Sequence, residues 1–382
     1  LSQIFITSTF LIIFKFTEDF FENKIHRFLS ILLLVGISFY NFTTPEFNVY
    51  ICALPFIALT TLYCWKGINN NNYTNWLLFG FFAGLGVLSH YLFIYLLVAL
   101  EIFFIYLIII KKFNFRCLIS IYSFILVLTP HFVWLVDNNY TTITYAFERT
   151  GLENLNTFLN HLIHPFVFLG KQIGILIPFL IMGLLTVPNF KNKINLKDKK
   201  LLFLISITIL PLVLIFITSL VLGIKIRTMW MTPFYLFLGV LFVYIFKKKI
   251  YLNNRKYFFT AFLIFFMLSP ITYLYISTTQ TDKRTDYPGK KVSDIIQKKW
   301  DENFVNEIAL VAGDEWYGGN LSYHLKSRPK WDNITDEEKE ISINDIEGGF
   351  VMIGEYKILL DICPGIFFKS EDEGVCMIGK KK

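Results

Sequence analysis

The chain has 382 residues, of which 54% are hydrophobic and 18% aromatic, whereas only 17% are charged. A soluble domain carries roughly 25% charged residues, so this composition excludes an ordinary soluble enzyme and predicts a polytopic membrane protein. The net charge of +7 lies largely in short connections between apolar runs, where it reports membrane orientation and gives no support to a nucleic-acid partner.

About ten apolar runs are long enough, or nearly long enough, to cross a bilayer. The first is already under way at Ile4 with no initiator methionine before it, so we expect the natural protein to extend before Leu1. The pair 76–89 and 91–110 has two interpretations, which are two short helices meeting at His90 or one helix with a re-entrant piece. The predicted spans are 2–16, 28–42, 49–65, 76–89, 91–110, 117–136, 166–187, 201–222, 228–246 and 257–276.

The basic residues between the spans predict the orientation. Seventeen Lys and Arg residues lie in one alternate set of connections, and four lie in the other, namely Arg149, Lys171, Lys225 and Arg227. By the positive-inside rule the first set faces the cytoplasm. Loops 41–48, 137–165 and 223–227 then face outward, together with everything after about residue 275.

Residues 277–382 form a second predicted domain after the membrane domain at 1–276, because charged residues and Gly become frequent and no further span follows. We expect an amphipathic helix over 289–304, buried strands over 308–312 and 350–353, and a helix capped by Asp314 and ending at Leu325. The fold class is therefore a polytopic α-helical membrane protein with a small extracytoplasmic α/β domain. In an oxidising compartment Cys363 and Cys376 can pair, and two free thiols are the alternative.

No phosphate-binding Gly-Lys-Ser/Thr loop, dinucleotide fingerprint, HExxH motif or CxxC pair occurs, so any chemistry must come from scattered residues at membrane exits. The adjacent acids Glu18 and Asp19 are best explained as a solvated cytoplasmic loop. Glu46 and Asn48 lie at the outer mouth of the third span. Both a catalytic role and helix capping, with Pro45 in the first turn, explain them.

The stretch 130–151 combines His131, Asp137 and Arg149 with several aromatic residues. This mixture suits a bound phosphate and sugar, although an interfacial aromatic belt has the same composition. His131 and His90, which lies at an outer turn, are each either ligand-binding or structural. Glu101 lies mid-span, where an acid indicates either function or a hydrogen bond between helices.

Arg149, Lys171 and Arg227 lie at predicted outer helix ends. Arginine is suited to bidentate contacts with phosphate, so the three cations are candidates to converge on one lipid phosphate. Snorkelling toward lipid headgroups is the alternative.

Five stretches in this order resemble the bacterial membrane glycosyltransferases of the GT-C superfamily that are related to protein O-mannosyltransferases and to the lipid A aminoarabinose transferase. They are 41–68, 76–97, 128–151, 287–300 and 310–329. The resemblance implies a polyprenyl-phosphate sugar donor, inverting transfer in a single displacement at the outer face of the bacterial inner membrane, and often a divalent metal.

In this family an acid in the first outer loop acts as base, and that loop would precede Leu1. A second acid of the family corresponds to Asn48, which cannot act as a base, so Glu46 takes that role or the role is lost. The family often has Lys where this chain has His90. The donor phosphate is typically held by basic residues that Arg149 and Arg227 match loosely, and Lys171 less closely.

Two other functions share some of these features. A lipid or polysaccharide exporter would have similar spans and basic residues, but the chain shows no internal repeat of the kind many transporters have. An O-antigen polymerase or ligase would also act on lipid-linked sugars, but such enzymes usually place their large outer loop between spans.

Overall fold

The computed structural model describes residues 1–70, 72–150, 158–187, 194–250, 255–280, 286–332, 348–370 and 373–382, with the side chains of 147–150 and 255 left out. Contacts divide the chain into two units, Leu1–Leu274 and Tyr275–Lys382. This division lies close to the boundary predicted after residue 276.

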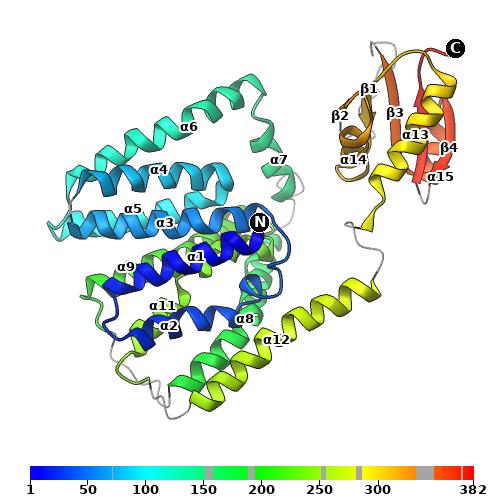
Figure 1. Cartoon of the computed structure of the whole chain (residues 1–382). Helices are drawn as coiled ribbons and strands as arrows, with labels where there is room; N and C mark the ends of the chain where they lie inside the picture. The colour runs from blue at the N-terminus through cyan, green and yellow to red at the C-terminus, as the bar shows by residue number, and fades with distance from the viewer. Residues whose placement is uncertain are drawn as a thin grey trace. The chain divides into compact units, whose positions relative to one another are not determined.

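The first unit is helical (Figure 1). Its α-helices are α1 (Ser2–Phe16), α2 (Lys24–Leu32), α3 (Val49–Asn70), α4 (Tyr73–Ser89), α5 (Ile94–Ile109), α6 (Ile119–Asp137), α7 (Thr141–Thr150), α8 (Asn160–Thr186), α9 (Lys199–Thr208), α10 (Leu210–Leu222), α11 (Leu238–Phe246) and α12 (Arg255–Thr279), the last of which crosses the boundary between the units. Its 3-10 helices are η1 (Thr17–Asp19), η2 (Leu33–Gly36), η3 (Ser38–Tyr40), η4 (Tyr91–Phe93), η5 (Phe115–Leu118) and η7 (Thr228–Tyr235).

Within the described residues, five helices are long and apolar enough to cross a membrane, or up to seven if each of two bent pairs forms one span. The polytopic membrane character is therefore confirmed, whereas the count of ten stays a prediction. Several predicted spans are short or broken: 28–42 begins inside the nine-residue helix α2 and continues as 3-10 turns. α9 and α10 meet at a 40° bend. Pro211 lies at the start of α10, where its ring disfavours a continuous helix through the preceding turn.

One end of the first unit gathers most of the predicted cytoplasmic loops, and we call it the basic end. Lys199 Nζ donates to Asn69 Oδ1 at 3.1 Å, which joins the start of α9 to the end of α3. The Tyr244 hydroxyl donates to Asp198 Oδ2 at 2.7 Å, which adds the end of α11. Lys200 donates to the Asp19 carbonyl, which adds the connection after α1.

The opposite end gathers the start of α1, the loop 41–48 and the starts or ends of α3 to α6, and we call it the Asn48 end. Ser2 donates to the Thr44 carbonyl, so α1 begins beside that loop. Tyr95 donates to Thr218 at 3.0 Å, which joins the start of α5 to the end of α10. The helices therefore run alternately between these two ends, in agreement with the alternation of basic residues in the predicted loops.

Close helix packing in this unit depends on small residues. A Cβ at Gly80 on α4 would overlap with the Ser120 carbonyl oxygen near the start of α6, so the two backbones touch. By contrast, a Cβ at Gly170 on α8 would meet nothing within 4 Å. Gly80 is therefore required by packing, whereas Gly170 is not.

The second unit is an α/β fold. Its elements are α13 (Gly289–Asn303), β1 (Ile308–Ala312), α14 (Tyr317–His324), β2 (Lys330–Asp332), β3 (Gly349–Glu355), α15 (Tyr356–Ile362), β4 (Ile366–Ser370) and β5 (Glu373–Ile378). The sheet order is β2-β1-β3-β5-β4. β1 pairs in parallel with β2 and β3, whereas β5 pairs antiparallel with β3 and β4.

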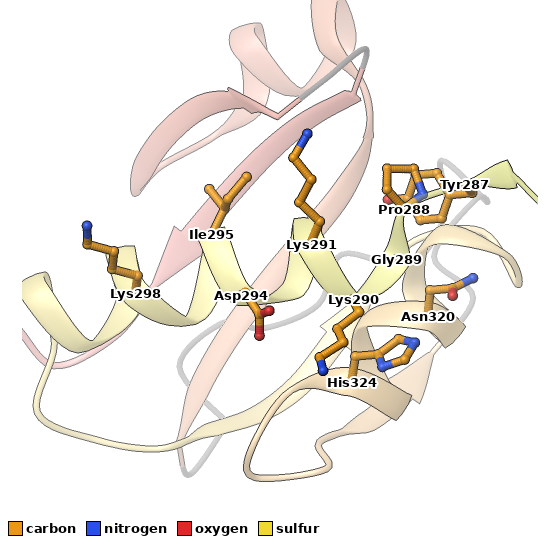
Figure 2. Close-up of a pocket in the computed structure, with 10 residues that line it drawn as sticks. All are labelled: Tyr287, Pro288, Gly289, Lys290, Lys291, Asp294, Ile295, Lys298, Asn320 and His324. Atoms are coloured by element: carbon orange, nitrogen blue, oxygen red, sulfur yellow. The ribbon is translucent and has the colours of Figure 1, made fainter.

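The predicted helix over 289–304 and both predicted strands are present. α13 buries Val292, Ile296 and Trp300, at spacings of four residues, against the sheet core. Asp314 Oδ1 accepts hydrogen bonds from the backbone N–H groups of Trp316 at 2.9 Å and Tyr317 at 2.6 Å, so the predicted cap is confirmed. α13 and α14 lie beside each other (Figure 2).

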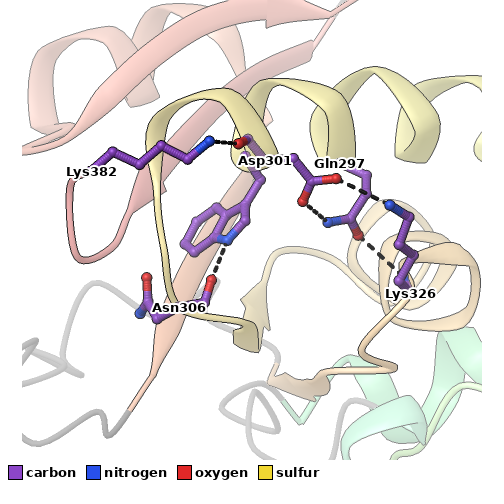
Figure 3. Close-up of polar contacts among 6 residues, drawn as sticks. Gln297, Asp301, Asn306, Lys326 and Lys382 are labelled. Atoms are coloured by element: carbon purple, nitrogen blue, oxygen red, sulfur yellow. Dashed lines mark hydrogen bonds and ion pairs between the residues drawn. The ribbon is translucent and has the colours of Figure 1, made fainter.

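Polar contacts join the C-terminal half of α13 to its neighbours (Figure 3). Gln297 Nε2 donates to Asp301 Oδ1 at 2.8 Å, and Lys326 Nζ lies 3.1 Å from Asp301 Oδ2. These two hydrogen bonds hold the pKa of the Asp301 carboxyl below its usual value. The Trp300 indole donates to the Asn306 carbonyl at 2.7 Å, which fixes the turn from α13 into β1.

Cys363 follows α15 and Cys376 lies in β5. The structure joins them in a disulfide with a Cα–Cα distance of 5.7 Å. This bond attaches the α15–β4 segment to the strand beside β3.

Candidate functional site at the Asn48 end

The loop before α3 places Asn48 at the helix start. Asn48 Oδ1 accepts hydrogen bonds from the N–H groups of Tyr50 at 3.1 Å and Ile51 at 3.2 Å, so Asn48 is the N-cap of α3. The capping interpretation is therefore right for Asn48. The expectation that Pro45 occupies the first turn is wrong, because the cap fixes the helix start at Val49. Glu46 lies in the turn before it and is exposed.

His90 separates two helices. Its extended backbone, with φ −163° and ψ 120°, ends α4, and the 3-10 turn η4 then leads into α5. Of the two interpretations of 76–110, two short helices is therefore right. The His90 ring meets the Tyr50 ring edge to face at 5.0 Å between centroids. Tyr50 thus brings Asn48 and His90 into one neighbourhood.

His131 belongs to a chain of polar side chains from three elements. Its Nε2 lies 2.7 Å from the Tyr91 hydroxyl, which lies 2.7 Å from Thr142 Oγ1. The imidazole also stacks on Trp134, at 5.8 Å and 12°. Because Tyr91 directly follows His90, both predicted histidines lie around the start of α5. The bonds and the stacking hold the His131 ring in one orientation.

The three predicted cations are not shown to converge. Arg149 lies in α7, and its side chain is outside the described residues. Lys171 on α8 and Arg227 before η7 are both exposed. Their sequence neighbours are joined, because Gln172 Nε2 lies 3.4 Å from the Thr228 carbonyl.

Gln172 is a functional candidate that the sequence did not indicate. It is 1% exposed, and its Oε1 accepts a hydrogen bond from the Tyr235 hydroxyl at 3.0 Å. Tyr235 lies in η7, so Gln172 ties α8 to η7 at two points. This pair of bonds fixes the backbone from which Lys171 and Arg227 extend.

Two further histidines were also missed, and they anchor the end of α10. His161 Nδ1 lies 3.0 Å from the Leu220 carbonyl, and His164 Nδ1 lies 2.7 Å from the Gly223 carbonyl. Gly223 has φ +66° and ends α10 in the left-handed conformation. The spacing of three residues, which places both imidazoles on one face of α8, is the signal that could have found them. They attach α8 to the chain that leads to Arg227.

The divalent metal suggested by the family resemblance finds no ligand set here. Among the described residues, no three His, Cys, Asp or Glu side chains lie together in a way that could hold a metal ion.

Residues 1–134 match the model of the dolichyl-phosphate-mannose-protein mannosyltransferase family. This supports a GT-C, mannosyltransferase-like membrane protein, and the resemblance inferred from the sequence is confirmed at that level. The description of this family names a mannosyltransferase that uses dolichyl-phosphate mannose. No curated protein and no solved structure matches the chain.

The matched segment runs from α1 into α6 and so contains part of the candidate site. Glu46, Asn48, His90 and His131 lie inside it. The three predicted cations and the whole second unit lie beyond it.

Proposed function

We propose that this protein is a glycosyltransferase that moves a sugar from a polyprenyl-phosphate donor to a lipid, glycan or protein acceptor. The observation that supports this most strongly is the family match, because the matched residues include the polar neighbourhood of Asn48, His90 and His131 at one end of the helices. The proposed location is the outer face of a bacterial inner membrane, with the second unit on the same side.

In the proposed reaction an acceptor oxygen attacks the anomeric carbon of the sugar while the bond from that carbon to the donor phosphate oxygen breaks. The acceptor proton goes to a base, and the electron pair stays on the prenyl phosphate, which leaves with an added negative charge. Inversion at the anomeric carbon follows from this single displacement.

We assign Arg227, Lys171 and Arg149 to the leaving phosphate, because cations near the phosphate stabilise charge that grows in the transition state. Glu46 is the proposed proton acceptor in this chain, since an exposed carboxylate in the loop 41–48 can reach an incoming acceptor. Asn48, His90 and His131 line the sugar side, with His131 oriented by Tyr91.

The decisive experiment uses the purified full chain in lipid nanodiscs with a radiolabelled polyprenyl-phosphate mannose. Arg227→Ala should lower the transfer rate by about 100-fold, because losing one preorganised donor that stabilises developing negative charge typically costs roughly 2.7–4 kcal/mol. Lys225→Ala is the matched control, because it removes an exposed charge from the same loop and should leave the rate unchanged.

Equal rates for the wild type, Arg227→Ala and Lys171→Ala, with equal amounts of folded protein, would remove the cations from the reaction. A wild-type chain that transfers no sugar from any polyprenyl-phosphate donor would contradict the proposed function itself.

A further inference from the structure

The second unit contains a pocket that the proposed reaction does not use. Its volume is about 780 Å³, within the range of about 300–1,000 Å³ typical of small-molecule sites. It lies along the N-terminal half of α13 and the facing side of α14 (Figure 2). Its charged and polar lining residues are Lys290, Lys291, Asp294, Lys298, Asn320 and His324.

The charge of this pocket is opposite to that of the unit around it. Residues 275–382 contain 15 Lys and Arg against 20 Asp and Glu, so the unit as a whole is acidic. The pocket nevertheless has three lysines and one acid. A local excess of positive charge on an acidic unit attracts an anion to that place.

Helical spacing accounts for the arrangement of the cations. Lys290, Asp294 and Lys298 follow one another at intervals of four residues and therefore lie along one side of α13. Asn320 and His324 have the same interval on α14. Figure 2 shows Lys290 extending toward the α14 side, where His324 lies. Asp294 lies on the same side, whereas Lys291 and Lys298 extend away from α14 (Figure 2).

The contact between α13 and α14 is close at one end of the pocket. A Cβ at Gly289 would overlap with Asn320 Oδ1, so the first turn of α13 lies directly against the Asn320 side chain on α14. The approach places the backbone at the start of a 15-residue helix next to the lysines. The helix dipole therefore adds to the positive potential.

We infer that the groove between α13 and α14 binds a saccharide that carries a phosphate group. The lysines and the start of α13 supply the positive charge for the phosphate. Asp294 repels a bare anion but accepts hydrogen bonds from hydroxyl groups, and the Asn320 amide both donates and accepts them. This combination favours a polyhydroxylated anion over a simple ion.

This inference deepens the proposed function, because it names the class of acceptor, and that part rests on the proposed function. The binding itself does not depend on sugar transfer. The saccharide phosphate can be a free molecule or the headgroup of a glycolipid, since both carry the same recognised groups.

The test measures binding to the full chain in phosphatidylcholine nanodiscs by isothermal titration calorimetry. The soluble arm compares mannose 6-phosphate, mannose and inorganic phosphate. The lipid arm uses vesicles that contain phosphatidylinositol, whose headgroup carries both phosphate and ring hydroxyls. Mannose 6-phosphate, the lipid headgroup, or both should bind, and mannose and inorganic phosphate should bind at least tenfold more weakly.

The double variant Lys290→Gln/Lys298→Gln should weaken this binding at least tenfold, and raising NaCl from 50 to 500 mM should weaken wild-type binding as well. The control variant Lys330→Gln/Lys381→Gln removes the same charge from exposed positions outside the pocket and should bind as the wild type does. Asp294→Asn should weaken mannose 6-phosphate and strengthen inorganic phosphate.

The absence of binding in both arms would overturn the inference, as would equal affinity for mannose 6-phosphate and inorganic phosphate, or an equal loss in the control variant. The transfer assay separates the two proposals. If the wild type binds the saccharide phosphate but transfers no sugar, the inferred binding site stands and the proposed function is rejected. If it transfers sugar but does not bind the saccharide phosphate, the proposed function stands and the inferred binding site is rejected.

Discussion

His131 illustrates how a single side chain gains its orientation from distant partners. Its imidazole is held by Tyr91 at the start of α5, by stacking on Trp134, and through Tyr91 by Thr142 on α7. Under the proposed function, an imidazole held at both its face and its edge would lose little further freedom on binding a sugar hydroxyl. Preorganisation of this kind reduces the entropic cost of binding.

A pair of substitutions at Asn48 can separate its role as a helix cap from a role in binding the sugar. Asn48→Asp keeps a side-chain oxygen for the two backbone N–H groups and should keep the stability, whereas Asn48→Ala should lower it by about 1 kcal/mol. Thermal unfolding of the detergent-purified variants measures this difference. If Asn48 also contacts the sugar, the transfer rate should fall in Asn48→Asp as well, despite its intact cap. A normal rate in Asn48→Asp would leave capping as the whole role.

At the scale of elements, the packing of α4 on α6 makes a clear prediction. Gly80→Ala should destabilise the first unit by about 1–3 kcal/mol, because the added methyl group collides with the Ser120 carbonyl. Gly170→Ala is its matched control. It should be neutral or stabilising by up to about 1 kcal/mol, since its Cβ meets open space and alanine favours a helix. The unfolding midpoint in dodecyl maltoside measures both. Equal effects of the two substitutions would contradict the close approach of α4 and α6.

The sequence predicted those elements that depend on local pattern. α13, β1 and β3 follow from periodicity, and the Asp314 cap follows from one residue before an apolar stretch. The bonds of Gln172 to Thr228 and of His161 to Leu220 could not be predicted, because the partners lie more than fifty positions apart and only the packing of α8 brings them together. The broken spans were not predicted because hydropathy reports apolar length and not where a helix bends or gives way to 3-10 turns.

At the scale of the whole molecule, the separation of charge between the two ends of the first unit predicts its orientation. In a variant lacking the three free cysteines, Lys225→Cys should react with a membrane-impermeant maleimide in intact spheroplasts. Asn70→Cys, at the basic end, should react only after permeabilisation. The physical reason is the excess of Lys and Arg around the basic end, which are retained on the cytoplasmic side during insertion. Labelling in the reverse order would place the candidate site on the wrong side for the proposed reaction.

The position of β5 in the sheet has a consequence for shortened forms of the protein. β5 runs between β3 and β4, although it comes last in the chain. A chain that ends before Glu373 would lack β5 and expose the full edge of β3, whose side chains Phe350, Val351 and Ile353 are buried in the intact sheet. Such a bare, apolar strand edge recruits strands from other molecules. Chains truncated before β5 should therefore self-associate, whereas a chain that is only cut there should keep β5, because Cys376 stays joined to Cys363.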